Sequence, residues 1–144
     1  MDPMRRWARR ILSLAAAPAD ERKAVWAAVA LSPRVGRRLR RRGYAATRDW
    51  LAARPAPAVS AEAAVRADRA LRLLPWQPRC LERSLLVWWL AGDGAEIHLG
   101  VSPEGRRFHA WVERDGTVLN DHPDVATRYL PFRGTDVDTD RFDQ

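Results

Sequence analysis

The stretch FHAWVERDGTVLND, residues 108–121, decides the fold that this sequence predicts. Apolar residues alternate with polar ones on both sides of Asp115 and Gly116, which is the pattern of two half-buried strands joined by a tight turn. The same alternation occurs earlier in EIHLGV, residues 96–101, and the turn-forming residues 103–105 follow it. We therefore expect three antiparallel strands in the second half of the chain.

Ahead of these strands, the apolar residues recur at helical spacing. The sequence predicts a first amphipathic helix at residues 4–17, whose basic and then apolar start also resembles a signal peptide. Further helices follow from capping residues and from Pro33, which we expect to end a helix. They cover about residues 20–31, 34–42, 47–53, 60–74 and 80–91, with Asp20, Thr47 and Ser60 as N-caps.

These elements predict an α+β domain over residues 1–133, in which a helical N-terminal half precedes a helix packed on a small antiparallel sheet. The chain has 144 residues, of which 47% are hydrophobic, and seven are tryptophans, so one domain with a substantial core is expected. Residues 134–144 contain four aspartates and few apolar side chains. We therefore expect an acidic and flexible tail there.

The charge balance favours acidic partners. The formal net charge is +7, and Lys23 is the only lysine, so arginine carries nearly all of the positive charge. Nucleic acid, an anionic membrane surface and an acidic peptide or protein all fit such a charge. No apolar run reaches the roughly 20 residues that span a bilayer. The single cysteine, Cys80, excludes an internal disulfide and a multi-cysteine metal site, and it fits the reducing cytoplasm.

Cys80, His109 and Asp121 occur in an order that suits thiol chemistry. A thiolate is the nucleophile in such chemistry, and the N–H groups at the start of a helix stabilise a negative charge. A histidine across the cleft can pair with the thiolate and then protonate a leaving amine. An acid beyond the ring fixes the tautomer and orientation of the imidazole. A lone helical cysteine is more often a small buried hydrophobic residue, so the ordered combination carries this prediction.

The hairpin between the strands decides whether the histidine and the acid can meet. A two-residue loop would turn Asp121 to the wrong side of the sheet. A three-residue loop at residues 114–116 pairs Glu113 with Thr117, and it sets His109 directly opposite Asp121. We therefore predict the three-residue loop, with glycine as its left-handed residue.

Two further residues are candidates for contacts with substrate or transition state. Gln77 lies three residues before Cys80, so its amide can supply an oxyanion donor beside the Cys80 N–H; a loop-solvating role fits it equally well. Trp111 shares the strand face of His109 and is expected to line the cleft. The two remaining histidines suggest no metal site.

Residues 37–42, RRLRRR, form the densest basic run of the chain. One interpretation is a solvated helix face. The other is a docking surface for a partner protein, for the acidic tail or for a membrane surface. Nucleic acid fits the charge, but no known nucleic-acid-binding motif accompanies the run. No specific nucleic-acid partner is therefore predicted.

Three segments together resemble the leader peptidases of lasso-peptide biosynthesis, which are transglutaminase-like cysteine proteases: RCLERSL at residues 79–85, FHAWVE at 108–113 and LND at 119–121. PDV at 123–125 and YLPF at 129–132 also look like that family, and the resemblance covers about residues 76–132. It implies a papain/transglutaminase-like fold. It also implies that Cys80 is the nucleophile, His109 the base and Asp121 the orienting acid.

The resemblance further implies a substrate and partners. The substrate would be a ribosomally made precursor peptide, cut between its leader and its core. We expect no leader-recognition domain in this chain, so the resemblance implies the stand-alone form. Such a form works with a separate leader-recognition protein and hands its product to an ATP-dependent cyclase that closes the macrolactam. Hydrolysis itself needs no cofactor.

Two other functions stay open at this point. The same triad serves acyl transfer to an amine, as in transglutaminases and arylamine acetyltransferases, and the acceptor site cannot be read from the sequence. A non-catalytic basic adaptor, which binds nucleic acid or an acidic protein, is the second alternative. Thiol alkylation separates the adaptor from both enzymes, because only the enzymes would lose their activity.

Overall fold

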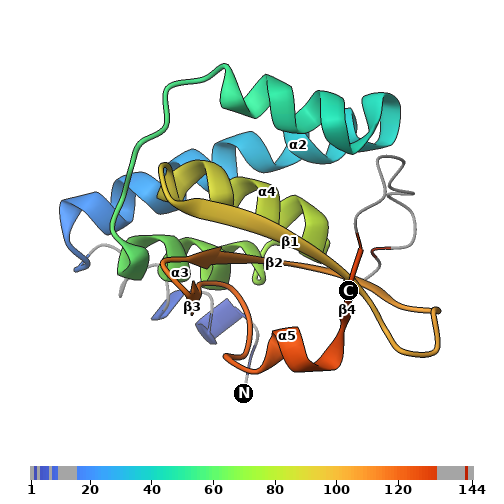
Figure 1. Ribbon diagram of the computed structural model, residues 1–144. Helices are drawn as coiled ribbons and strands as arrows, with labels where there is room; N and C mark the ends of the chain where they lie inside the picture. Colours follow the sequence, from blue (N-terminus) through green and yellow to red (C-terminus); the bar gives the residue numbers. More distant parts are fainter. Residues whose placement is uncertain (1, 3, 7, 10–15, 133–141, 143–144) are drawn as a thin grey trace.

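Helices make up the first half of the described chain, and the strands follow them (Figure 1). The computed structural model describes residues 2, 4–6, 8–9, 16–132 and 142. Helix α4 joins the two parts of the fold, because it contacts α2 and α3 and also β1 and β2. This is the predicted α+β arrangement. The elements in chain order are α2 (Ala19–Ala52), α3 (Ala61–Leu71), α4 (Cys80–Ala91), β1 (Ala95–Val101), β2 (Phe108–Arg114), β3 (Thr117–Val118), α5 (Val125–Arg128) and β4 (Leu130–Pro131).

The predicted helix at residues 4–17 is described in part, and residues 4–6 and 8–9 are helical. The acidic tail at residues 134–144 falls almost entirely outside the described residues. Phe142 is the tail residue that the structure describes. It is fully buried, and its ring centroid lies 5.6 Å from that of Phe108 on β2. Phe142 therefore belongs to the hydrophobic core.

Helix α2 runs past the position where the sequence predicts its end. Pro33 lies inside the helix, although an interior proline costs about 3 kcal/mol. The buried stripe of Leu31, Val35 and Leu39 continues across the proline, and its burial against the domain outweighs that cost. The helical path breaks instead at Gly43, whose φ of 83° lies in the left-handed region.

The capping prediction is confirmed for one helix and wrong for two. Ser60 caps α3, and its hydroxyl accepts a hydrogen bond from the N–H of the third helical residue at 3.2 Å. Asp20 lies in the first turn of α2, where a negative charge suits the helix dipole, and Pro18 occupies the N-cap. Thr47 lies within α2, and its hydroxyl donates to the carbonyl of Gly43 at 2.7 Å.

Helix α4 begins at Cys80, as predicted, and is buried on nearly all sides. A helix that is apolar all round belongs in the interior of a domain. Each fully buried leucine contributes roughly 1.5–3 kcal/mol relative to an exposed one, so this helix is a large part of the hydrophobic stabilisation. Among the residues that the structure describes, no helix combines the length and the apolarity needed to cross a bilayer. The fully buried side chains of α4 include Leu85, Leu86, Val87 and Leu90.

The sheet is antiparallel and has the strand order β3-β2-β1-β4. Strands β1 and β2 pair along their full length, from Ala95 opposite Arg114 to Val101 opposite Phe108. The short strand β4 pairs with the end of β1 and is not among the predicted strands. The alternating pattern of the sequence therefore predicts the central hairpin but not this edge.

The loop between β2 and β3 has two residues, so the predicted three-residue loop is wrong. Arg114 pairs with Thr117, and Asp115 and Gly116 form the turn. Their φ angles are 52° and 77°, both in the left-handed region, as a type I′ turn requires. Asp-Gly is a preferred sequence for that turn, because aspartate tolerates the left-handed region and glycine adopts it freely.

Candidate active site

Cys80 is the first residue of α4, and its side chain lies at the positive end of the helix dipole. It is 1% exposed. The loop before it is held in an unusual conformation, because Gln77 has a φ of 44° although it is not glycine. Arg79 is extended and forms the N-cap. Residues 77–79 therefore fix where the helix begins and where its unpaired N–H groups point.

The chain leaves the sheet directly after β3. Leu119 still donates its backbone N–H to the Val112 carbonyl at 2.9 Å. The Val112 N–H, however, donates to a side chain instead of a backbone carbonyl: its acceptor is Oδ1 of Asn120 at 2.8 Å. The following bend brings Oδ2 of Asp121 into contact with Nε2 of His109. The predicted contact between His109 and Asp121 therefore forms in spite of the two-residue loop.

Asp121 and Cys80 act together on the protonation of His109. Burial of the ring favours the neutral imidazole, but the hydrogen bonds and charges of Asp121 and Cys80 outweigh burial and raise the pKa of His109 to about 9. Burial also opposes ionisation of Asp121, but its hydrogen bonds with His109 and His122 and the nearby positive charges lower its pKa. At neutral pH this geometry therefore favours an imidazolium held by a carboxylate.

The two ring nitrogens of His109 have different surroundings. Nε2 contacts Asp121, whereas Nδ1 is buried and has no hydrogen-bond partner of ordinary geometry in the described part of the chain. Nδ1 is thus the nitrogen left to exchange a proton with the Cys80 sulfur or with a substrate. Nucleophilic thiol catalysis requires an imidazole that contacts an acid through one ring nitrogen and faces a thiol with the other.

Asn120 and Arg72 tie the bend that carries the acid to the helices. The Asn120 side-chain amide donates to Oγ of Ser84 on α4 at 3.0 Å. Its backbone carbonyl accepts a hydrogen bond from Nη2 of Arg72 at 2.8 Å, and Nε of Arg72 donates to Asp68 on α3 at 2.8 Å. The position of Asp121 is therefore set by contacts to β2, α3 and α4 rather than by a strand pairing of its own.

A buried ion pair supports the other side of the site. Nε of Arg83 on α4 lies 3.3 Å from Oδ1 of Asp68 on α3, and the two side chains are 9% and 5% exposed. Nη1 of Arg83 also donates to the carbonyl of Pro78 at 2.7 Å, two residues before Cys80. Burial raises the pKa of Asp68 and lowers that of Arg83. Asp68 thus contacts both arginines: Arg83, which holds the loop before Cys80, and Arg72, which holds the bend before Asp121.

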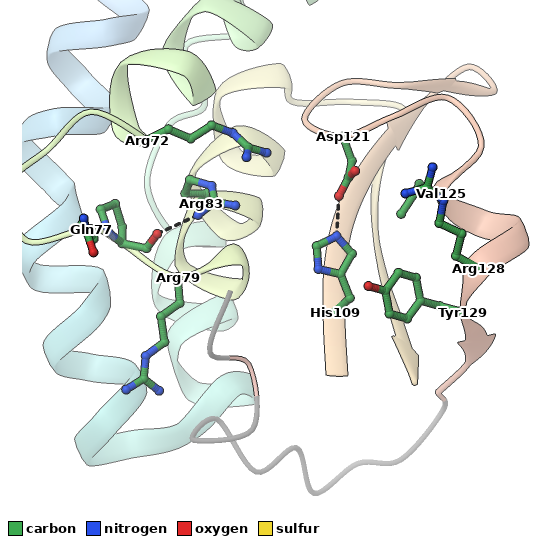
Figure 2. Close-up of a pocket in the computed structure, with 10 residues that line it drawn as sticks. Arg72, Gln77, Arg79, Arg83, His109, Asp121, Val125, Arg128 and Tyr129 are labelled. Atoms are coloured by element: carbon green, nitrogen blue, oxygen red, sulfur yellow. Dashed lines mark hydrogen bonds and ion pairs between the residues drawn. The ribbon is translucent and has the colours of Figure 1, made fainter. Parts of the chain in front are cut away.

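A pocket of about 460 Å³ opens between the start of α4 and the strand that carries His109. Figure 2 shows Gln77, Arg79 and Arg83 on one side of it and His109 and Asp121 across from them. Cys80 is not part of the lining, so residues 77–79 form the wall on its side. Four guanidinium groups and the Asp121 carboxylate line the pocket, and this excess of positive charge attracts anionic and carbonyl groups. The complete lining is Arg72, Gln77, Pro78, Arg79, Arg83, His109, Asp121, Val125, Arg128 and Tyr129.

Two aromatic rings pack against the imidazole of His109. The Tyr129 ring stacks on His109 with centroids 4.9 Å apart. Trp111 is 4% exposed, stacks behind His109 at 6.1 Å and donates its Nε1–H to Glu113 at 3.2 Å. Trp111 was expected to line the cleft, but it is not among the lining residues of the pocket. Gly100 allows this packing, because a Cβ there would lie 2.6 Å from Cβ of Tyr129.

The residues that hold His109 and Asp121 in place are harder to identify from the sequence. Asp68 carried a usable signal, because it falls on the apolar face of a predicted helix, and a buried acid there requires a cationic partner. Arg72, Arg83 and Ser84 carry no such signal, because an arginine or serine near the end or the start of a helix is ordinary. Gln77 lies in the pocket wall, and its role as an oxyanion donor stays a prediction.

Residues 23–133 match the family model described as the transglutaminase-like superfamily, which accounts for more than half of the chain. The protein belongs to this superfamily. Membership fits a cysteine peptidase or an acyltransferase. Comparison with curated proteins gave no significant match, and comparison with solved structures gave none either.

Proposed function

We propose that this protein is a cysteine peptidase that removes the leader from a lasso-peptide precursor, with Cys80 as nucleophile, His109 as general base and acid, and Asp121 as the orienting carboxylate. One observation carries the proposal: the His109–Asp121 contact lies beside a cysteine that begins a buried helix, and the two partners together raise the pKa of the histidine. Membership of the transglutaminase-like superfamily supports the same chemistry.

The reaction follows from these roles. The Cys80 thiolate attacks the scissile carbonyl carbon, and the Cys80 N–H, with Gln77 as a second donor, stabilises the oxyanion. The tetrahedral intermediate collapses as the His109 imidazolium gives its proton to the leaving amine, which leaves a thioester on Cys80. Water then attacks the thioester while neutral His109 takes a proton from it. Release of the carboxylate product restores the thiolate–imidazolium pair.

The choice of substrate rests on the segments at residues 79–85, 108–113 and 119–121, which resemble the lasso leader peptidases. The same resemblance supports a leader-recognition protein as partner and an ATP-dependent macrolactam cyclase as the next enzyme. A flexible leader costs entropy to order, and a partner that binds it raises the effective concentration of the scissile bond. Action in the cytoplasm, where such precursors are made, is part of this proposal.

The test is cleavage of a lasso-peptide precursor in the presence of a leader-binding protein, followed by mass spectrometry. Cys80→Ala should abolish cleavage, and His98→Ala, which alters a histidine outside the pocket, should leave it near wild type. Circular dichroism of both variants checks the fold. Undiminished cleavage by folded Cys80→Ala protein would contradict the proposal.

Acyl transfer is the second reaction that the superfamily allows. The same assay distinguishes the two reactions when a primary amine is added, because the masses of hydrolysis and aminolysis products differ. A product that carries the amine at low amine concentration would assign acyl transfer. A free carboxylate as the main product supports the peptidase.

A further inference from the structure

Five arginines of α2 share one face of the helix. Their spacing, i, i+3, i+4, i+7 and i+8, places them along a single stripe. The neighbouring stripe, with Leu31, Val35 and Leu39, is buried in the core. Four of the five side chains are exposed, and that of Arg38 is half-buried. This arginine face consists of Arg34, Arg37, Arg38, Arg41 and Arg42.

The arginine face lines a second pocket. After the break at Gly43, the last part of α2 turns back over the first part (Figure 1) and carries Trp50. The five arginines and Trp50 enclose about 280 Å³. This pocket shares no lining residue with the one that contains His109. It is therefore a separate site on the helical part of the fold.

The arginine face concentrates five positive charges on one stripe of α2. In the part of the chain that the structure describes, none of its five guanidinium groups forms an ion pair with a carboxylate. The i,i+4 pairs, such as Arg34 with Arg38 and Arg37 with Arg41, repel each other at a cost of roughly 0.2–0.5 kcal/mol each. A ligand with negative charge would relieve this repulsion.

The chemistry of the pocket favours carboxylates over nucleic acid. The guanidinium carbons of Arg38 and Arg54 lie 4.7 and 4.5 Å from the centroid of the Trp50 ring, so these cations occupy the ring and leave no platform on which a base could stack. Arginine forks bind carboxylates through two parallel hydrogen bonds. A compact pocket also accommodates a few carboxylate side chains better than it accommodates an extended phosphate backbone.

We propose that the arginine face is a docking site for a carboxylate-rich segment of a peptide or protein partner. At least two carboxylates of that segment would bind between α2 residues 34–42 and Trp50. The inference goes beyond the proposed reaction and does not depend on it, because docking needs neither Cys80 nor His109. If the proposed function is correct, the site would hold the precursor or its leader-binding partner at a distance from the scissile bond.

The experiment measures fluorescence polarisation of a labelled glutamate-rich peptide of about ten residues, a length that presents several carboxylates at once. The same peptide with every glutamate replaced by glutamine is the ligand control. R37Q/R41Q should weaken binding by about tenfold or more, because it removes two charges from the face. The matched variant R69Q/R106Q removes two exposed charges elsewhere and should change binding by less than about twofold.

Three results would overturn the inference. Equal binding of the glutamate and glutamine peptides would show that carboxylates are not recognised. Equal loss in R37Q/R41Q and R69Q/R106Q would show that net charge alone drives binding. Tighter binding of a single-stranded oligonucleotide than of the peptide, lost in R37Q/R41Q, would assign the face to nucleic acid. Thermal unfolding of both variants confirms that they are folded, and the single variant R37Q replaces any double variant that is not.

Discussion

The side-chain amide of Asn120 donates a hydrogen bond to Oγ of Ser84 at 3.0 Å, which joins the bend before Asp121 to the helix that begins at Cys80. Both side chains are buried. The other end of the Asn120 side chain accepts the N–H of Val112 on β2 at 2.8 Å. A single residue therefore sets the distance between the acid, the strand of His109 and the helix of the nucleophile.

Replacing Asn120 should reduce both stability and activity. Asn120→Leu preserves the approximate volume but leaves the Ser84 hydroxyl and the Val112 N–H buried without a partner, at roughly 1–3 kcal/mol for each group. We expect a loss of about 2–4 kcal/mol in the free energy of unfolding, measured by urea denaturation. The cleavage rate should fall by more than the loss of folded protein accounts for, because the bend that positions Asp121 loses its contacts with β2 and α4.

A double-mutant cycle isolates the contact with Ser84. Ser84→Ala together with Asn120→Leu should cost less than the sum of the single variants, because the second substitution removes a partner that is already lost. The expected coupling is about 1 kcal/mol. Additive losses would mean that the two side chains do not interact in solution.

Removing one partner of the buried Asp68–Arg83 ion pair should lower the free energy of unfolding. Asp68→Asn leaves the buried Arg83 guanidinium without a counter-charge, and such changes typically cost about 3–5 kcal/mol. The loop before Cys80 should loosen as well, because Arg83 holds the Pro78 carbonyl. Chemical denaturation measures the stability, and hydrogen exchange of residues 77–80 measures the loop.

Asp124→Asn is the matched control, because Asp124 pairs with Arg128 at the surface, where both side chains are more than half exposed. Exposed ion pairs contribute only about 0–1 kcal/mol. Similar losses for Asp68→Asn and Asp124→Asn would show that the buried network does not hold the site.

The sequence predicts the parts of this fold that periodicity determines. The strand around His109 and the helix from Cys80 follow from alternating and all-apolar runs, and both occur where expected. Pro33 and the hairpin loop were predicted wrongly because tertiary packing and turn geometry decide them. A helix with a strong buried stripe tolerates a proline, and an Asp-Gly pair favours the tighter type I′ turn.

The contact between His109 and Asp121 was predicted for an incorrect reason. The predicted register would have placed the two residues opposite each other within a ladder. In the structure, β3 ends at Val118, and the Asn120 side chain replaces a backbone acceptor, so the acid arrives by a bend. Sequence periodicity cannot show such a departure, because it depends on side-chain contacts with Ser84 and Arg72.

Gly100 should not tolerate even a methyl group. Its Cβ would lie 2.6 Å from Cβ of Tyr129 and 2.9 Å from the Trp111 ring. Cβ of Tyr129 is fixed to the backbone, so the segment before β4 must shift, at a cost of about 1–3 kcal/mol. Gly100→Ala should therefore lower the melting temperature and the cleavage rate.

The control for this substitution is Gly105→Ala. Gly105 also precedes β2, but nothing lies within 4 Å of the position that its Cβ would take. It has a φ of 74°, so Gly105→Ala carries backbone strain without the clash. A cleavage rate that falls equally in both variants would argue against a role for the contact between Gly100 and Tyr129.

The raised pKa of His109 predicts how activity and stability depend on pH. The pKa is about 9 in the folded protein and about 6.5 in the unfolded chain, so the imidazolium stabilises the fold fully below about pH 6.5. That contribution is lost as the pH rises through about 9. Asp121 has a lowered pKa, so its contribution is present above about pH 3.8 and is lost as the pH falls below that value.

Cleavage should therefore persist to about pH 9 and decline above it, because neutral His109 cannot protonate the leaving amine. Asp121→Asn removes the charge that favours the imidazolium, so the alkaline limb should move down by about one unit or more. The imidazole resonances of His109 in an NMR titration give the same pKa without any substrate. A value near 6.5 in the wild-type protein, or an identical titration in Asp121→Asn, would contradict the role given to this contact.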